Sequence, residues 1–73
     1  MRIRLRQGAV YGVCKALDIS RDELSRRMKV ATTTAWRVEK GDVDPSPKFI
    51  AGLITVSGGS FEDHFEIVGE DAA

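Results

Sequence analysis

Residues 20–41, SRDELSRRMKVATTTAWRVEKG, carry the start and end signals of two short helices and decide the fold. Ser20 with Glu23 three residues later is a capping-box pattern, in which the serine hydroxyl accepts the third amide and the glutamate reaches back to the cap amide. Leu24 and Met28 lie four residues apart and supply the inward stripe of this helix. The first of the two helices is therefore expected to cover about eight residues.

The second helix is expected to run from Thr32 to Lys40. Gly41 follows it directly and suits the left-handed backbone at a helix C-terminus. Ala35 and Val38 are three residues apart and point inward, so the remaining threonine, tryptophan and arginine side chains lie on a different face. Two short helices joined by a turn of about three residues are the helix-turn-helix arrangement.

The N-terminal flank reads Arg-Ile-Arg-Leu-Arg over residues 2–6. Its period of two predicts a short strand with Ile3 and Leu5 on one face, but the same residues also suit a flexible basic arm or an irregular lead into the next helix. Residues 9–17 place apolar side chains at i, i+3, i+4 and i+7, which predicts an amphipathic helix.

The C-terminal flank begins with a loop over residues 42–45, because a residue before proline avoids helical geometry. Ser46 then caps a fourth helix, and Pro47 occupies its first position. The expected buried face of this helix comprises Phe49, Ile50, Leu53, Ile54 and Val56. Gly58-Gly59 stops it. Residues 61–65 are expected to form a last helical turn capped by Ser60, with an extended segment over 65–68 as the alternative, and residues 71–73 are expected to fray.

These elements predict an all-α fold of five short helices with a central helix-turn-helix and either a short N-terminal strand or an arm. The organisation is then a basic arm or strand (1–8), the helix-turn-helix domain (9–65) and an acidic tail (66–73). The chain has 73 residues and one cysteine, which excludes an intrachain disulfide framework and a multi-thiolate zinc site. No apolar run approaches the ~20 residues that span a bilayer, and the N-terminus lacks the apolar core of a signal peptide.

The formal net charge is zero, but the charges are sorted along the chain. Residues 1–56 hold all eleven basic residues against six acids, a net charge of +5, and residues 57–73 hold five acids and no Lys or Arg. Because salt screens charges over roughly 8 Å, each part presents its own field. A basic body with an acidic tail remains compatible with a nucleic-acid partner.

Residues 20–41, followed by Asp-Pro-Ser over 44–46 and Ser-Phe-Glu-Asp-His-Phe over 60–65, resemble the Cro/C1-type (XRE-like) family of phage and bacterial DNA-binding regulators. The family pattern runs roughly Ser-Gln-Glu-Glu-Leu-Ala, Leu-Gly-Val-Ser, a Thr-Ile pair, Arg-Ile-Glu-Arg-Gly, Asn-Pro-Ser and a closing Ser-Leu-Asp-Glu-Leu-Phe. The resemblance covers about residues 9–65 as an ordered set of motifs.

The resemblance implies that one face of the second helix of the motif enters the major groove. Base contacts then fall to Thr32, Thr33, Trp36 and Arg37, and contacts to the DNA backbone to Arg21, Thr34, Lys40 and Lys48. Arg37 suits a bidentate contact to guanine, and the threonines suit a softer readout in which the methyl packs on thymine. Trp36 either stacks on sugar and thymine methyl groups or folds over the turn at Lys29, and the favoured interpretation is a partly buried packing residue.

Four features depart from the family pattern, of which Ser25 in place of a small alanine is tolerable. Lys29 replaces the turn glycine, so it either accepts a left-handed conformation or bends the turn differently. Ala35 replaces a branched residue and thins the contact between the two helices. Asp42 and Asp44 lie in a loop that commonly carries Lys, Arg or Asn beside DNA phosphates, which argues against tight binding.

The other notable residues need no chemical role. Cys14 is expected in the core, and His64 on the surface or in a cap. No second His or Cys accompanies His64, so no metal site is expected. The chain shows no Gly-rich phosphate loop and no nucleophile with a base, and it lacks room for a substrate cleft. We therefore expect no enzyme, no cofactor and no small-molecule substrate.

The leading hypothesis is a sequence-specific transcriptional regulator, a Cro-like repressor that binds a double-stranded DNA operator as a homodimer in the bacterial cytoplasm. The dimer surface is expected around residues 61–68 or at the Ile3–Leu5 segment. Arg2, Arg4 and Arg6 either pair with Glu66 and Glu70 or form an arm that enters the minor groove. The alternative hypothesis is a helix-turn-helix fold used as a protein-interaction module, such as a phage inhibitor of a host factor, an antirepressor or an antitoxin.

Overall fold

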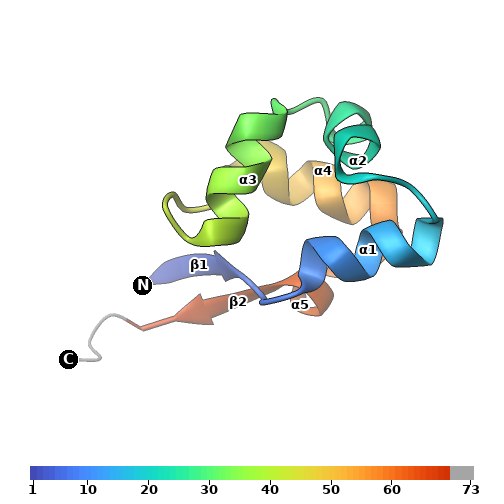
Figure 1. Ribbon diagram of the computed structural model, residues 1–73. Coiled ribbons are helices and arrows are strands. Elements are labelled where there is room, and N and C mark those ends of the chain that lie inside the picture. The colour runs from blue at the N-terminus through green and yellow to red at the C-terminus, as the bar shows by residue number, and fades with distance from the viewer. Residues whose placement is uncertain (70–73) are drawn as a thin grey trace.

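The computed structural model describes residues 1–69, and this part of the chain is mostly helical (59%), with five helices and one two-stranded antiparallel sheet (Figure 1). The elements in chain order are β1 (Arg2–Leu5), α1 (Ala9–Leu17), α2 (Arg21–Met28), α3 (Thr32–Lys40), α4 (Pro47–Ser57), α5 (Phe61–His64) and β2 (Phe65–Val68). The five predicted helices are confirmed. The fold is mostly helical as predicted, and the possible N-terminal strand is present in a small sheet that joins the two ends of the described chain.

The boundaries of α2 follow the predicted signals with one difference. The Ser20 hydroxyl accepts a hydrogen bond from the Glu23 amide at 3.1 Å, as expected for a helix cap. The reciprocal half of the capping box is not formed, because the Glu23 carboxylate accepts hydrogen bonds from Arg26 at 2.8 Å and Arg27 at 3.0 Å. At the other end Lys29 takes the left-handed conformation with φ of +62°, so a lysine carries out the role of the turn glycine.

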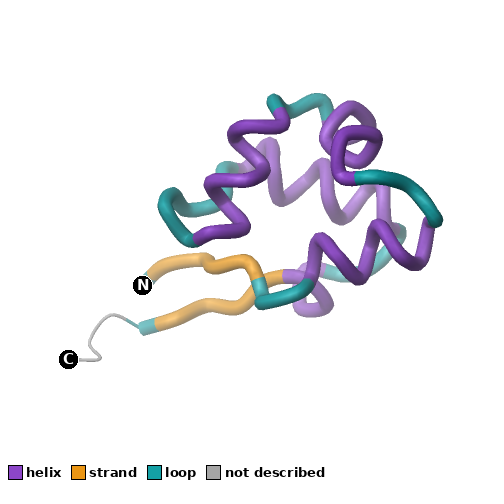
Figure 2. The backbone as a smooth tube through the Cα atoms, viewed as in Figure 1, coloured by secondary structure: helices purple, strands orange, loops and turns teal. Residues whose placement is uncertain are grey.

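The ends of the next two helices confirm their capping residues. Gly41 follows α3 with φ of +84°, and Gly58 follows α4 with φ of +76°. The Ser46 hydroxyl accepts a hydrogen bond from the Phe49 amide at 3.1 Å, and Pro47 occupies the first turn of α4. The loop between these helices joins the end of α3 to the start of α4, and Figure 2 traces its path in teal.

The sheet pairs Arg2 with Val68, Ile3 with Ile67, Arg4 with Glu66 and Leu5 with Phe65. Helix α5 ends at His64, one residue earlier than the predicted helical turn, and Phe65 begins the strand. Both expectations for this region are therefore met in part, because a one-turn helix leads directly into an extended segment. The N-terminal residues form the predicted strand instead of a free arm. Residues 70–73, including Glu70 and the expected frayed end, lie outside the described part of the chain.

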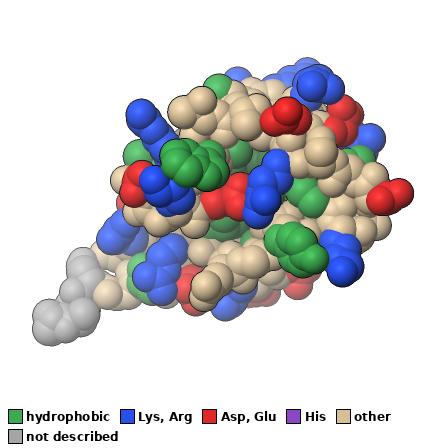
Figure 3. All heavy atoms as spheres, in the orientation of Figure 1, with side chains coloured by type: hydrophobic (Ala, Val, Ile, Leu, Met, Phe, Trp, Pro, Cys, Tyr) green, Lys and Arg blue, Asp and Glu red, His purple; other side chains and the backbone are tan. Residues whose placement is uncertain are grey.

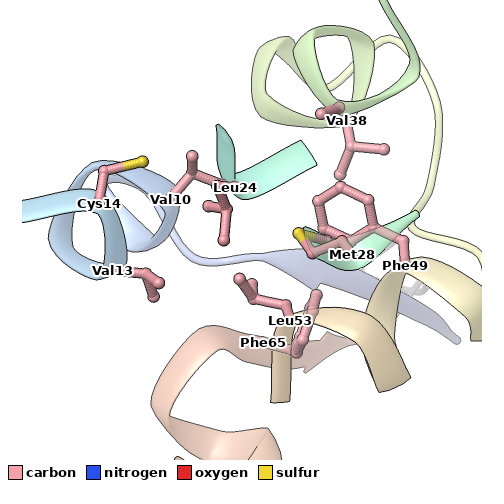
Figure 4. Packing of buried hydrophobic residues seen from close by; sticks show 10 residues of the cluster. Val10, Val13, Cys14, Leu24, Met28, Val38, Phe49, Leu53 and Phe65 are labelled. Carbon is pink, nitrogen blue, oxygen red and sulfur yellow. The ribbon is translucent and has the colours of Figure 1, made fainter. Parts of the chain in front are cut away.

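The core gathers side chains from four helices and β2. Phe49, Leu53, Leu24 and Phe65 are fully buried, and Figure 4 shows side chains from α1, α2, α3, α4 and β2 converging on them. Within the predicted face of α4 only Phe49 and Leu53 are buried, and the other three residues pack at its margin. Cys14 lies in the core as expected, where burial raises the pKa of its thiol.

His64 is buried, so the surface alternative expected for it from the sequence is wrong. Its side chain is 8% exposed, and its Nε2 lies 2.8 Å from the Ser57 hydroxyl at the end of α4. Asp63 beside it accepts a hydrogen bond from the Ser60 amide at 2.9 Å, which lowers the pKa of the Asp63 carboxyl. The histidine thus links α5 to α4. Within residues 1–69 no helix is long and apolar enough to cross a membrane.

Candidate nucleic-acid interface

The packing of α3 determines which of its residues face outward. Ala35 and Val38 are buried against the core, and this contact fixes the rotation of the helix. Thr33, Arg37 and Lys40 follow one another at intervals of four and three residues and form an exposed stripe on the other side. Thr32 and Thr34 are also exposed and flank this stripe near the start of the helix.

Arg37 has no hydrogen bond or ion pair to any of residues 1–69. A guanidinium in this state keeps its planar array of donors available for an external acceptor. Lys48, in the first turn of α4, is also exposed and has no ion pair among the described residues. These two predicted contact residues are therefore free cations in the described part of the chain.

Lys40 is held in place by two neighbours. Its Nζ lies 3.6 Å from Asp42 Oδ2 and 4.0 Å from the centroid of the Trp36 ring. A cation over an indole face is an attractive arrangement that orients both side chains. The outer end of α3 therefore presents an aromatic plane with a cation above it.

Trp36 is 55% exposed and therefore partly buried, and the side chain that packs on its ring is Lys40 rather than the turn at Lys29. It borders a hollow of about 370 Å³ between α2 and α3, whose walls include Thr32 and Thr33 and whose interior reaches Leu24 and other core residues. Figure 3 views the molecule from this side, where a hydrophobic side chain stands out over α3 and another over α1, with acidic and basic groups between them.

Arg21 lies at the start of α2 as expected, but its charge is shared. Its Nη2 lies 3.1 Å from Glu39 Oε1, and its Nε donates to the same oxygen at 3.2 Å. Glu39 belongs to α3, so this pair links the two helices on the rim of the hollow. Arg21 can reach an external anion only by exchanging this partner or sharing it.

The two loop acids are both engaged in ion pairs. Asp42 contacts Lys40, and Asp44 accepts hydrogen bonds from Arg2 of β1 at 2.6 Å and 3.2 Å. The Arg2 guanidinium lowers the pKa of the Asp44 carboxyl through this hydrogen bond. Each acid is thus matched by a cation, so the loop carries less repulsion toward phosphate than its composition indicates.

The arginines of β1 are used within the chain. Arg4 and Arg6 both contact the Glu66 carboxylate, at 3.2 Å and 3.3 Å. Arg6 also donates to the Glu62 carbonyl at 2.9 Å. The predicted pairing with Glu66 is confirmed within one chain, while Arg2 uses Asp44, and the proposed pairing with Glu70 lies outside the described residues.

Two groups of exposed side chains outside α3 include residues that were missed from the sequence. Tyr11 of α1 is 58% exposed, and the Nζ of Lys15, one turn later, lies 5.6 Å from the centroid of its ring. At the end of α2, the missed Arg27 and Lys29 line a shallow hollow of about 350 Å³ together with the predicted contact residue Lys48 of α4. The i and i+4 spacing of Tyr11 and Lys15, outside the apolar stripe of their helix, is the signal that could have identified the first group.

No protein-family model, curated protein or solved structure matches this chain. The geometry of its own residues is therefore the basis for any functional proposal.

Proposed function

We propose that this protein is a sequence-specific double-stranded DNA-binding regulator, a Cro-like repressor, in which α2 and α3 form a helix-turn-helix. The observation that carries the proposal is the exposed stripe of α3. It combines threonine hydroxyls with the unpaired guanidinium of Arg37, while Asp42, Asp44 and Glu39 nearby are each matched by a cation. Such a surface offers donors to base edges without a free acid beside them.

In this proposal α3 lies in the major groove. Arg37 donates to O6 and N7 of a guanine, and Thr32 and Thr33 contact base edges near the start of the helix. Trp36 completes the set of base contacts. Arg21, Thr34, Lys40 and Lys48 contact phosphates and fix the register of the protein on the duplex. Tyr11 and Lys15 on one side of α3, and Lys29 on the other, extend the phosphate contacts to both strands.

A repressor of this kind acts by occupying an operator and excluding polymerase, and we propose that it does so as a homodimer. Two-fold symmetry would match half-sites separated by one DNA turn, roughly 34 Å. The sheet contributes an exposed apolar side chain outside the core, because Ile67 is 60% exposed although its strand partner Ile3 is half-buried. This end of the sheet is our candidate for the dimer contact.

A gel-shift titration against the DNA upstream of the protein's own gene, at two salt concentrations, tests the proposal. Affinity is expected to fall steeply with salt, because phosphate contacts release counterions. Arg37→Ala is expected to weaken specific binding by 10-fold or more, since a bidentate contact to guanine contributes about 1–3 kcal/mol. Absence of binding at low salt would rule out the proposal.

A protein-interaction module is the second candidate, and one observation favours it. Trp36 and Tyr11 are both more than half exposed, and the hollow bordered by Trp36 is predominantly apolar. Exposed aromatic residues are enriched in protein interfaces. A host protein captured equally by the wild type and by Arg37→Ala would support this candidate, because the two functions place different demands on Arg37.

A further inference from the structure

Trp36 is the aromatic residue of α3, and its side chain is one of the predicted base contacts of the proposed interface. Its indole is held by Lys40, whose Nζ lies 4.0 Å from the ring centroid. This contact orients the ring but leaves it 55% exposed to solvent. The exposed part of the indole is largely apolar, so covering it with another apolar group is favourable.

The residues around Trp36 restrict what that group can be. Thr33, three residues earlier on the same helix, lines the same hollow and places a second apolar group beside the indole. The next residue, Arg37, is a free cation that points from the same exposed surface. The partner that fits here must therefore carry a small apolar group directly beside an anionic or strongly accepting one.

The major groove of DNA offers this combination at one kind of step. The C5 methyl of thymine is the apolar feature of an unmodified base edge, and the O6 and N7 atoms of guanine are its strongest paired acceptors. Neighbouring residues on a helix reach neighbouring positions of the groove. The charge of Arg37 and Lys40 favours this partner over an apolar peptide, because Lys40 lies over the indole and the exposed Arg37 follows Trp36 in the chain.

We infer that Trp36 is a specificity-determining residue that selects a thymine methyl group adjacent to the guanine bound by Arg37. This inference rests on the proposed DNA-binding function and names the base feature that the site recognises. The indole face and the Thr33 methyl cover the C5 methyl, while Arg37 donates to the neighbouring guanine. Deoxyuridine differs from thymidine only in lacking this methyl group, so a duplex with deoxyuridine at this position is expected to bind less tightly.

The test uses the full chain and the duplex that it enriches from a random-sequence pool. Each thymine of that duplex is replaced in turn by deoxyuridine, and affinities are measured by fluorescence anisotropy at one salt concentration. The wild type is expected to lose about fourfold in affinity at one thymine next to a guanine, as expected for one buried methyl group. Trp36→Ala is expected to bind the thymine and deoxyuridine duplexes equally.

Tyr11→Ala is the matched control, because Tyr11 has nearly the same exposure as Trp36 but lies on α1. It is expected to bind both duplexes less tightly and to keep the fourfold ratio between them. A wild type that tolerates deoxyuridine at every position, or a Trp36→Ala variant that keeps the ratio, overturns this inference while DNA binding itself stands. Failure of the wild type to enrich or bind any duplex overturns the proposed function as well.

Discussion

At the scale of single residues, the Arg21–Glu39 pair is the contact that most directly limits the proposed interface. Glu39 accepts a hydrogen bond from Arg21 Nε and forms an ion pair with Arg21 Nη2, and its side chain is only 19% exposed, so the arginine is held toward α3. An arginine in this position can bind phosphate only by giving up part of that contact. In the proposed interface, this pair therefore lowers the affinity for DNA while it links α2 to α3.

Glu39→Gln is expected to strengthen DNA binding, because it removes an acid from the interface and leaves Arg21 free to contact phosphate. The plot of log affinity against log salt concentration is expected to become steeper by about one unit, the effect of one added phosphate contact. Titration by fluorescence anisotropy at several salt concentrations measures both quantities.

Asp22→Asn is the control for this change, because Asp22 lies next to Arg21 and has no ion pair among the described residues. It removes the same charge without releasing a cation. Its affinity is expected to rise less, with an unchanged slope. An equal effect of the two variants would show that net charge alone, and not the release of Arg21, controls binding.

At the scale of elements, α4 packs closely against the end of α2 at Gly52. A Cβ atom added at Gly52 would lie 3.1 Å from the Met28 carbonyl oxygen and 3.2 Å from the Met28 Cβ. Met28 is the last residue of α2, and the left-handed Lys29 directly after it ends that helix. Gly52 therefore permits α4 to approach the end of α2.

Gly52→Ala is expected to lower the free energy of unfolding by about 1 kcal/mol, because the cost of overpacking exceeds the gain in helix propensity. Gly12→Ala is the matched control in α1, where an added Cβ meets nothing within 4 Å. It is expected to raise the free energy of unfolding by about 0.5–1 kcal/mol. Thermal unfolding followed by circular dichroism measures both. A rise in melting temperature for Gly52→Ala similar to that for Gly12→Ala would show that α2 can move aside.

The helices could be predicted from the sequence because their ends carry local signals. Ser46 accepts a hydrogen bond from a backbone amide in the first turn of its helix, and Gly41 and Gly58 take the left-handed conformation that ends a helix. These effects act within one turn, so they do not depend on the rest of the fold. The period of two in residues 2–6 indicated a strand but could not identify its partner, since the pairing with β2 joins segments more than sixty residues apart.

The parts of the site that were missed depend on contacts distant in sequence. Arg2 neutralises Asp44 only because the sheet brings β1 beside the loop after α3. His64 is buried because α5 packs against the end of α4, where Ser57 receives it. Neither of these outcomes follows from the residue type alone.

At the scale of the whole molecule, the net charge is zero, but some charged side chains form ion pairs and others do not. Glu66 and the loop acids are matched by arginines and lysines, whereas Arg37, Lys29 and Lys48 have no ion pair within residues 1–69. Arg37 lies on α3, Lys29 in the turn before it and Lys48 in the first turn of α4. Glu70 and Asp71 add two negative charges at the end of the chain.

Deletion of residues 69–73 removes these two acids and changes the formal net charge from zero to +2. Non-specific affinity for a random-sequence duplex is expected to rise about threefold at low salt, because exposed charges contribute a few tenths of a kcal/mol each, and the rise is expected to vanish as salt screens them. The full-length double variant E70Q/D71N separates charge from length. If charge is the cause, it reproduces the gain of the deletion. Unchanged affinity in both variants would show that the acidic end of the chain does not compete with DNA phosphates, and the balance of charge around α3 alone would then set the strength of non-specific binding.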